Sequence, residues 1–471
     1  MLASDAAGAL VELRQDPVLA KGLDLLAAVC APDAAGGKLD ERLQLLRQHH
    51  GRVADLLPQL LARVHGSDGA SAEQSRTAVR LAQQLARAMH QAFKQAAAQG
   101  SLTKGLFARQ RPAVEALSLA LLTGWELACV YAHTYTALPA RFWAECHQFF
   151  AHAVEQGWES KSHGPAEPSM EETYIRILLM SMTGANRYEP YQIGTLIDLV
   201  AEAAPHTGIV AAHRMAEDKA AFLFRLDEDE PPAFGLPPAP AEGGSRYVVD
   251  VKEAVEVLQR RMDEPRAGAV PLSRRQRQVY ERVRREWQYP AQRRHERRSR
   301  ADGERVEMVS SMAVCWDIAQ QGDGAQAGTV FDVLNTSDSG MLLQGESDSQ
   351  HLIPGEIVAY RRLGKPWQTG MIRWVGFQAE SLTTLCGIEH VGGMPHAVMI
   401  APVMAQMEPY QHALRLQGHS TVVISGHHFH PFREFHLDDG GEVTRIQAIK
   451  LVFQSALYQV MAYQAGGSKD E

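Results

Sequence analysis

The chain has 471 residues, of which 45% are apolar and 22% are charged. This length allows about three domains at roughly 150 residues each, and the composition excludes a short disulfide-stabilised scaffold and a wholly disordered chain. The 47 basic and 55 acidic residues leave a net charge of −8, which argues against a general nucleic-acid coat protein.

The charge is distributed unevenly along the chain. Residues 274–300 contain eleven arginines, three glutamates and no lysine, a net charge of +8, so the other 444 residues together have a charge of −16. The protein is therefore acidic with one short basic segment, which we call the Arg-rich segment.

The cysteines and the apolar stretches indicate the compartment. An odd number of scattered thiols without a CxxC pair is typical of a reducing cytosol, and we expect a cytoplasmic protein: the cysteines are Cys30, Cys129, Cys146, Cys315 and Cys386. The first ten residues contain Asp5 and no Lys or Arg, which is unlike a signal peptide. The most apolar stretch, residues 113–133, contains Glu115 and Glu126, which favours a buried helix over a membrane span.

The N-terminal part of the chain has helical patterning. Ser71 and Gln74 have the spacing of a capping box, and Ser169 and Glu172 form a second one. After the first box, apolar side chains recur at helical intervals until Gly100, where we expect the helix to end: these are Leu81, Leu85, Met89, Phe93 and Ala96. We therefore expect a mainly helical, all-α domain at residues 1–270.

A loop or linker is predicted inside this region, at residues 226–245. It contains four consecutive acidic residues, five prolines and three glycines. The apolar stretches on either side, Ala221–Phe224 and Tyr247–Val251, predict a hairpin with this loop at its tip. The pattern is helical again over Val251–Arg261, and residues 271–304 form an Arg-rich connector.

From about Arg305 onward, short apolar runs alternate with Gly, Asp, Asn and Pro, which is typical of a small β-barrel or sandwich. We expect a barrel at residues 305–400 and a β-rich extension at residues 401–471. The predicted strands are Thr329–Leu334, Met341–Leu343, Ile357–Tyr360, Met371–Val375, Leu385–Glu389, Ala397–Ile400, Ser420–Ile424 and Phe435–Leu437. Residues Thr444–Tyr463 fit a helix or strands, and their β-rich context favours strands.

Two short motifs lie on either side of the start of this β-rich part. Two arginine pairs, Arg293/Arg297 and Arg294/Arg298, each have a spacing of four residues, and about forty residues later Asn335, Ser337 and Gly340 lie in a turn-like hexapeptide. Together they resemble the two-part signature of PilZ domains. Three further segments are similar to the family, within a resemblance that covers Arg293–Ile400: Pro354-Gly355-Glu356, Arg373-Trp374-Val375 and Cys386-Gly387-Ile388-Glu389.

The resemblance implies a six-stranded barrel that binds the bacterial second messenger cyclic di-GMP. The residue types suit this ligand, because an arginine guanidinium binds a phosphate or the O6/N7 edge of guanine bidentately and stacks on a purine, whereas lysine is a point charge. We expect Gly340 to give the turn a positive φ. The predicted ligand-binding residues are Arg293, Arg294, Arg297, Arg298, Asn335, Ser337 and Gly340.

Two registers of the arginine pair stay open. With Arg294/Arg298 as the pair, Arg293 precedes it, at a position where the family tends to use an extra arginine for two stacked ligand molecules. With Arg293/Arg297 as the pair, Gln292 precedes it and a single ligand is favoured. The segment between the two motifs, including Met312–Ile318, is longer than in the shortest family members, and we expect an extra element there.

Several observations argue against enzymatic activity. The chain contains no GxxxxGK[ST], GxGxxG, GxSxG or GGDEF-like motif, and Glu115-Ala116-Leu117 lacks the carboxylates of a two-metal phosphodiesterase. His428 and His430, next to His427, are expected on one strand face, but no hydrolytic motif accompanies them, so we expect neither a metal site nor a metal-dependent enzyme. Arg274–Arg285 is expected to be a solvated amphipathic helix outside the site, because Leu272, Val279, Val283 and Trp287 recur at helical intervals.

We therefore predict an α+β multidomain protein that is a cytoplasmic, non-enzymatic receptor for cyclic di-GMP, with no cofactor. Ligand binding would change its domain arrangement or its contacts with a protein partner of the helical domain, and would regulate motility, pili or exopolysaccharide. No specific nucleic acid and no membrane span are expected. The alternatives are a nucleic-acid-binding protein that uses residues 274–300, a metal-dependent enzyme built on the His427–His430 cluster, and a ligand-free scaffold with a degenerate barrel.

Overall fold

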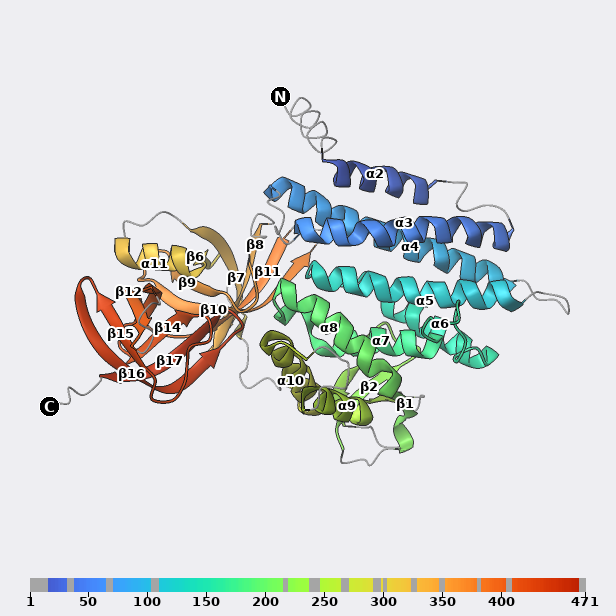
Figure 1. Ribbon diagram of the computed structural model, residues 1–471. Coiled ribbons are helices and arrows are strands. Elements are labelled where there is room, and N and C mark those ends of the chain that lie inside the picture. Colours follow the sequence, from blue (N-terminus) through green and yellow to red (C-terminus); the bar gives the residue numbers. More distant parts are fainter. Residues whose placement is uncertain are drawn as a thin grey trace, which may run out of the picture. The chain divides into compact units, whose positions relative to one another are not determined.

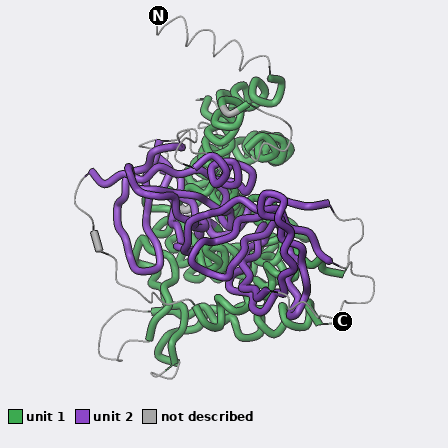
Figure 2. The backbone as a smooth tube through the Cα atoms, turned by 90° about the vertical axis from the view of Figure 1, so that its left-hand side faces the viewer, with its two compact units in different colours: residues 1–185, 190–291 green, residues 186–189, 292–471 purple. Residues whose placement is uncertain are grey.

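The computed structural model (Figure 1) describes residues 16–31, 38–64, 71–102, 110–214, 219–236, 246–263, 271–290, 298–299, 303–322, 328–346, 352–378, 383–403 and 409–465. The chain divides into two compact units, which Figure 2 shows in different colours. The first unit contains residues 1–185 and 190–291, and the second contains residues 186–189 and 292–471.

The first unit is built mainly from helices that lie side by side (Figure 1). They are α2 (Pro17–Val29), α3 (Leu39–Val64), α4 (Ala72–Leu102), α5 (Gln110–His133), α6 (Phe142–Gln156), α7 (Met170–Thr183), α8 (Pro190–Ala203), α9 (Lys252–Asp263) and α10 (Arg274–Gln288). Short 3-10 turns accompany them at Ala185–Arg187, Ala204–His206 and Ala212–Arg214.

Local signals in the sequence begin α4 and α7. At α4 the Gln74 N–H donates to Ser71 Oγ at 3.2 Å, and the Ser71 N–H donates to Gln74 Oε1 at 2.8 Å. At α7 the Glu172 N–H donates to Ser169 Oγ at 3.1 Å. Each contact satisfies a backbone donor that has no partner within the helix, so the two predicted helix starts are confirmed.

The predicted end of α4 at Gly100 is wrong, because the helix continues to Leu102. Gly100 instead lies against α5, where a Cβ on this glycine would be 3.1 Å from Ala113 Cα. The glycine therefore permits a close approach of two helices. The predicted apolar stripe of α4 is buried at Leu81, Leu85, Met89, Phe93 and Ala96.

α5 is long and apolar enough to cross a membrane by length and composition, with a mean hydropathy of 1.5. However, 67% of its most apolar window is buried inside the structure, as in the core helix of a soluble protein. Its two acidic residues pair with α3: Glu115 lies 2.7 Å from Arg47 Nη1, and Glu126 lies 2.8 Å from His50 Nε2. The prediction of a buried helix is confirmed.

The first unit also contains a four-stranded antiparallel sheet, of which the sequence analysis expected only two strands, as a hairpin in an otherwise all-α region. Its order is β1-β4-β2-β3, with β1 at Gly208–Ala211, β2 at Ala221–Arg225, β3 at Ala233–Gly235 and β4 at Arg246–Asp250. The predicted hairpin pairing is confirmed, because Phe222 of β2 opposes Val249 of β4. In the acidic stretch after β2, Asp229 accepts hydrogen bonds from the N–H groups of Arg141 (2.7 Å) and Ala144 (2.9 Å), at the start of α6.

α10 contains six of the eleven arginines of the Arg-rich segment. It begins with a capping box between Ser273 and Gln276 and buries the predicted apolar positions Val279, Val283 and Trp287. Its arginines lie on the remaining faces, where Arg274, Arg275 and Arg285 are exposed. The prediction of an amphipathic helix with solvated arginines is confirmed.

The second unit contains two closed six-stranded barrels. The first barrel has the ring order β7-β6-β9-β10-β11-β8, closed by the pairing of β7 with β8, and β5 is added to β7. The strands are β5 (Arg298–Ser299), β6 (Arg305–Ser310), β7 (Thr329–Ser337), β8 (Gly340–Glu346), β9 (Ile357–Arg362), β10 (Gln368–Gln378) and β11 (Thr383–His390). The six-stranded barrel is thus confirmed, with β6 as a strand that the sequence did not predict.

The C-terminal β-rich region forms the second barrel, with the ring order β12-β13-β14-β17-β16-β15. The strands are β12 (Pro395–Pro402), β13 (Gln411–Leu416), β14 (Thr421–Ser425), β15 (Glu434–Asp439), β16 (Glu442–Gln454) and β17 (Tyr458–Ala465). The predicted strand Ala397–Ile400 lies in β12, so the first barrel ends with β11. Residues Thr444–Tyr463 form parts of β16 and β17, as the β-rich context favoured.

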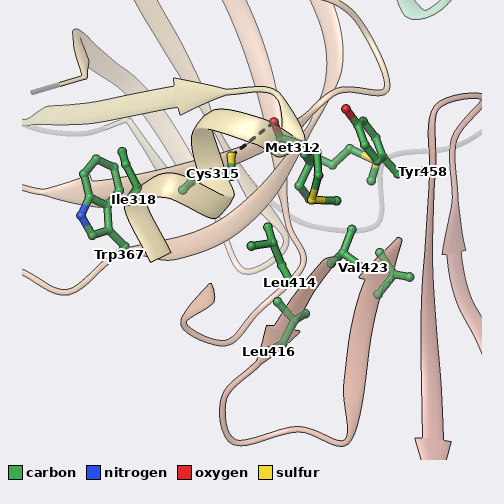
Figure 3. Packing of buried hydrophobic residues seen from close by; sticks show 12 residues of the cluster. Met312, Cys315, Ile318, Trp367, Leu414, Leu416, Val423 and Tyr458 are labelled. Atoms are coloured by element: carbon green, nitrogen blue, oxygen red, sulfur yellow. Dashed lines mark hydrogen bonds between the residues drawn. The ribbon is translucent and has the colours of Figure 1, made fainter. Parts of the chain in front are cut away.

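Between β6 and β7 the chain forms α11 (Met312–Gln321), the expected extra element. This helix contacts β6 and β9 of the first barrel and β12 and β13 of the second. Its Met312, Cys315 and Ile318 join buried residues of both barrels in one apolar cluster (Figure 3). A separate apolar cluster fills the interior of the second barrel, around Ile400, Phe435 and Ile446.

Candidate functional site

The two predicted motifs meet at the edge of the first barrel. β5 pairs antiparallel with the end of β7, with Arg298 opposite Thr336 and Ser299 opposite Asn335. Further along, the Val333 N–H donates to the Glu304 carbonyl at 2.9 Å, and Arg305 of β6 opposes Asp332. The backbone that enters the barrel therefore lies beside β7 both at residues 298–299 and at residues 304–305.

Most of the predicted arginines lie outside the described residues. These are Arg293, Arg294 and Arg297, and of Arg298 only the backbone is described. The structure therefore brings the backbone of Arg298 beside Asn335 and Thr336.

The other motif forms the end of β7, the turn and the start of β8. The register of β7 against β8 shifts between Val333 and Asn335, which leaves Leu334 as a bulge. Beyond the bulge, Asn335 opposes Leu342 and Ser337 opposes Gly340, so Asn335 and Ser337 point to the same side of the sheet.

The polar groups of this turn differ in their partners. The Ser337 hydroxyl donates to the Gly340 carbonyl at 3.3 Å and lies 3.3 Å from Ser339 Oγ. Asn335 is half-buried, and its side-chain amide makes no hydrogen bond to another residue that the structure describes. Its donors and acceptor therefore remain available to a ligand.

Gly340 is required for a different reason from the predicted one. Its φ does not lie in the left-handed region, so the expected positive φ is wrong. A Cβ at this position would lie 2.0 Å from the Ile388 carbonyl oxygen of β11. The glycine is needed because β8 and β11 approach each other closely at the turn.

Four residues form a row across the outer side of the first barrel, one from each of four neighbouring strands. Asn335 (β7) opposes Leu342 (β8), Leu342 opposes Gly387 (β11), and Gly387 opposes Trp374 (β10). Their interior-facing neighbours along the strands are buried, including Val333, Leu343, Cys386 and Val375. We call Asn335, Leu342, Gly387 and Trp374 the outer row of the first barrel.

The indole of Trp374 covers Gly387. A Cβ at Gly387 would lie 2.1 Å from Trp374 Nε1 and 2.6 Å from its Cδ1, so only glycine leaves room for the ring. A bulge at Arg373, where the register against β11 shifts between Ile372 and Trp374, turns the indole to the outer side. The half-buried ring supplies an aromatic surface in the same row as Asn335.

The sequence analysis did not include Trp374, Leu342 and Gly387 in the site. Trp374 and Gly387 did lie in segments similar to the PilZ family. A glycine inside a predicted strand is also a sign of close approach by another group. Their contact depends on the register of two strands, which the local sequence does not contain.

Charged groups that border the outer row are paired with one another. Arg373 Nε lies 2.9 Å from Glu389 Oε2, and Arg305 Nε lies 3.3 Å from Asp332 Oδ1. Burial lowers the pKa of His390, whose Nδ1 lies 2.6 Å from the Tyr360 hydroxyl. The two ion pairs are therefore neutral overall.

The histidine cluster after β14 is not on a strand, which corrects the expected shared face of His428 and His430. His427 Nε2 lies 3.0 Å from the Ser455 carbonyl oxygen, and His430 Nδ1 lies 2.9 Å from that of Pro431. Over the described ranges, no group of three His, Cys, Asp or Glu residues is arranged to hold a metal ion.

Comparison with known proteins bears on the helical part of the chain. Residues 5–213 match a family model described as "Cyclic-di-GMP receptor FimW, N-terminal domain". The match indicates a cyclic di-GMP receptor. It fits a receptor with an N-terminal helical domain, and it covers less than half of the chain, ending before the two barrels. No curated protein and no solved structure matches the chain.

Proposed function

We propose that this protein is a cytoplasmic, non-enzymatic receptor that binds cyclic di-GMP on the outer row of its first barrel. The connector arginines Arg293, Arg294, Arg297 and Arg298 would bind the phosphates and a guanine edge. Asn335, Ser337 and Gly340 would complete the site.

The observation that supports this site best is the pairing of β5 with β7. It puts the end of the Arg-rich connector next to Asn335, on the strand of the second motif. The two ion pairs that border the row are neutral, so we expect the connector arginines to supply the counter-charge for a phosphodiester there.

The outer row has the chemistry that a purine nucleotide needs. A guanine base can stack on the Trp374 indole and pack against Leu342. The Asn335 amide, which has no hydrogen-bond partner among the described residues, and the Ser337 hydroxyl can bind polar edges. Because the Trp374 ring packs on Gly387, its orientation is set in the protein without ligand. A preformed surface lowers the entropy lost on binding.

In the proposed mechanism, the connector has two states. Bound ligand bridges its arginines to β7 and stabilises the β5–β7 pairing, which shifts the population toward an ordered connector. The connector joins the helical unit to the barrels, so its ordering changes the contacts that the helical unit makes with a protein partner. Motility, pili or exopolysaccharide machinery is the proposed target.

The test is calorimetric titration of the full chain with cyclic di-GMP. Each bidentate arginine contact contributes roughly 1–3 kcal/mol, so Arg294→Ala/Arg298→Ala should weaken binding about tenfold or more. The matched control is Arg274→Ala/Arg277→Ala on α10, which removes the same charge outside the site and should change the affinity less than about twofold.

The outcomes separate the alternatives. No binding by the unaltered protein at tens of micromolar ligand contradicts the receptor and leaves a ligand-free scaffold. Equal losses in the two double variants contradict the site and indicate a general charge effect. A nucleic-acid-binding protein would instead bind polynucleotides, with an affinity that falls steeply with salt and depends on both groups of arginines.

A further inference from the structure

The two barrels have the same connectivity. In each, the first strand pairs with the second and fourth, the third pairs with the second and sixth, and the fifth pairs with the fourth and sixth. For the first barrel the six strands in chain order are β6 to β11, and for the second they are β12 to β17. A strand of one barrel therefore has a defined counterpart in the other.

The residue registers also correspond. In the second barrel Leu414 (β13) opposes Val423 (β14), Val423 opposes Val460 (β17), and Val460 opposes Phe453 (β16). This is the same path, from second to third to sixth to fifth strand, as the outer row of the first barrel. We call these four residues the outer row of the second barrel.

A bulge in the fifth strand supports the correspondence. In β10 the register against the sixth strand shifts between Ile372 and Trp374, and in β16 it shifts between Leu451 and Phe453. In both barrels the bulge comes directly before the aromatic residue of the outer row. Phe453 is therefore the counterpart of Trp374.

The chemistry of the second row is different. Leu414 and Leu416 stand where the first barrel has Asn335 and Ser337, and Thr421, opposite Leu416, stands where it has Gly340. Leu414, Val423 and Val460 are completely buried. The second row thus has no polar side chain to bind a nucleotide, and only Phe453 among its four residues is partly exposed.

α11 and the first barrel cover this face. Met312, Cys315 and Ile318 of α11 pack in the same cluster as Leu414, Leu416 and Val423 (Figure 3). Ile357, Ala359 and Met371, on the outside of β9 and β10, belong to it as well.

Two aromatic contacts complete the cover. Trp316 of α11 stacks on His412 of β13, with ring centroids 4.2 Å apart and planes 6° apart, and its Nε1–H donates to the Val398 carbonyl at 2.9 Å. The Arg373 guanidinium of the first barrel lies 5.0 Å from the ring centroid of Phe453. α11 and Arg373 thus cover the outer row of the second barrel. In the proposed function, a stacked, charged ligand covers the outer row of the first barrel in the same way.

We infer that the second barrel is a counterpart of the first, and that α11 packs on the face of the second barrel that corresponds to the ligand-binding face of the first. We call this face of the second barrel the seat of α11. The helix is its occupant, and the chain binds a cyclic dinucleotide at the first barrel alone. The statement about the dinucleotide rests on the proposed function, whereas the statement about α11 does not.

The seat is tested by hydrogen exchange of the full chain without ligand. Trp316→Ala removes the stack and the hydrogen bond, so amide exchange in β12 and β13 should rise about tenfold or more as this face opens. Val314→Ala is the matched control, because Val314 is 43% exposed on the same helix, and it should leave β12 and β13 unchanged. Unchanged exchange in Trp316→Ala would overturn the seat.

If Trp316→Ala does not fold, Trp316→Phe keeps an aromatic ring on His412, although a smaller one, and removes the N–H donor. It should give a smaller rise in exchange, confined to β12, where Val398 loses its partner. An increase in amide exchange that is spread evenly over both barrels would contradict specific packing of α11 on the second barrel.

The single nucleotide site is tested by titrating Asn335→Ala/Ser337→Ala with cyclic di-GMP. All saturable binding should disappear. Saturable binding that remains in this variant and is lost on Leu416→Asp would place a second site on the second barrel and overturn the inference. If the unaltered protein does not bind, the proposed function fails, and the exchange experiment still decides whether α11 occupies the seat.

Discussion

The same face of two barrels with the same connectivity carries different side chains in this protein. In the first barrel the outer row combines Asn335, Leu342 and the Trp374 ring over Gly387. In the second barrel the corresponding positions are Leu414, Val423, Val460 and Phe453, under α11. The backbone places an outer row at the same position in both barrels, and the side chains of that row determine whether it is exposed or covered by protein.

The difference teaches that the barrel fold alone does not predict a ligand site. A half-buried amide and hydroxyl favour contact with polar groups, whereas two leucines in the same positions favour contact with an apolar helix. The two rows can therefore be tested by exchanging their residues.

The largest effect is expected when the second barrel receives the residue of the first. Leu414→Asn removes a completely buried leucine and buries an amide without a partner, which should lower the free energy of unfolding by about 4 kcal/mol. Urea unfolding, followed by a probe in the second barrel, measures it.

The reciprocal variant is the control. Asn335 is half-buried, so Asn335→Leu should change the free energy of unfolding by less than about 1 kcal/mol, and on the proposed function it should weaken cyclic di-GMP binding about tenfold or more. Similar losses of stability in both variants would mean that the two rows are equally buried, which would remove the distinction between them.

The next effect concerns the glycine under Trp374. Gly387→Ala puts a Cβ within 2.1 Å of the indole, so the ring must move away, and the free energy of unfolding should fall by about 1–3 kcal/mol. Near-ultraviolet circular dichroism reports the displaced ring. In Gly376→Ala the new Cβ is 3.4 Å from Trp374 Cζ3, an ordinary contact, and this control should keep the native spectrum.

Much of this β-rich fold was predictable from its local pattern, and the exceptions have physical reasons. β6 was missed because Arg305 and Glu307 interrupt its apolar run. Glu307 is buried because Arg361 Nε, on β9, lies 2.6 Å from its carboxylate and the Gly328 N–H donates to it at 2.7 Å. These partners lie far along the chain, so no window of the sequence around β6 contains them.

The candidate site divides in the same way. Asn335, Ser337 and Gly340 follow from a short motif, whereas the placement of Trp374 over Gly387 depends on the β10–β11 register and on the bulge at Arg373. The reason for Gly340 was also non-local, because its neighbour is the Ile388 carbonyl of another strand. Local sequence predicts which residue types are present, and strand pairing decides what they contact.

A smaller effect is expected at the junction of the barrels, where the Tyr458 hydroxyl donates to Glu356 Oε1 at 2.5 Å. Burial raises the pKa of Glu356 above its usual 4.5, although the hydrogen bond from Tyr458 opposes this shift. The folded protein therefore binds the proton more tightly than the unfolded chain, so stability from this group is complete below about pH 4.5 and is lost as the pH rises through the raised pKa.

Urea unfolding at several pH values between about 4.5 and 7.5 measures this loss against Glu356→Gln, which does not titrate. The stability of the unaltered protein should fall relative to the variant as the pH rises, by about 1.4 kcal/mol for each unit of pKa difference. Tyr458→Phe removes the opposing hydrogen bond and should steepen the dependence. Parallel pH profiles for all three proteins would show that Glu356 does not link proton binding to the packing of the barrels.

The smallest effect is expected on the outer side of β15 and β16. These are the fourth and fifth strands of the second barrel, and their counterparts in the first barrel, β9 and β10, pack against α11. There the first barrel presents Ile357, Ala359 and Met371, whereas the second presents the exposed Arg445 paired with Glu434. An exposed ion pair contributes about 0–1 kcal/mol, so Arg445→Ala should change the free energy of urea unfolding by no more than that. A loss above about 2 kcal/mol, or a change in oligomeric state, would mean that other protein groups bury the Arg445–Glu434 pair. The outer sides of the two barrels would then both be covered, and they would differ only in what covers them.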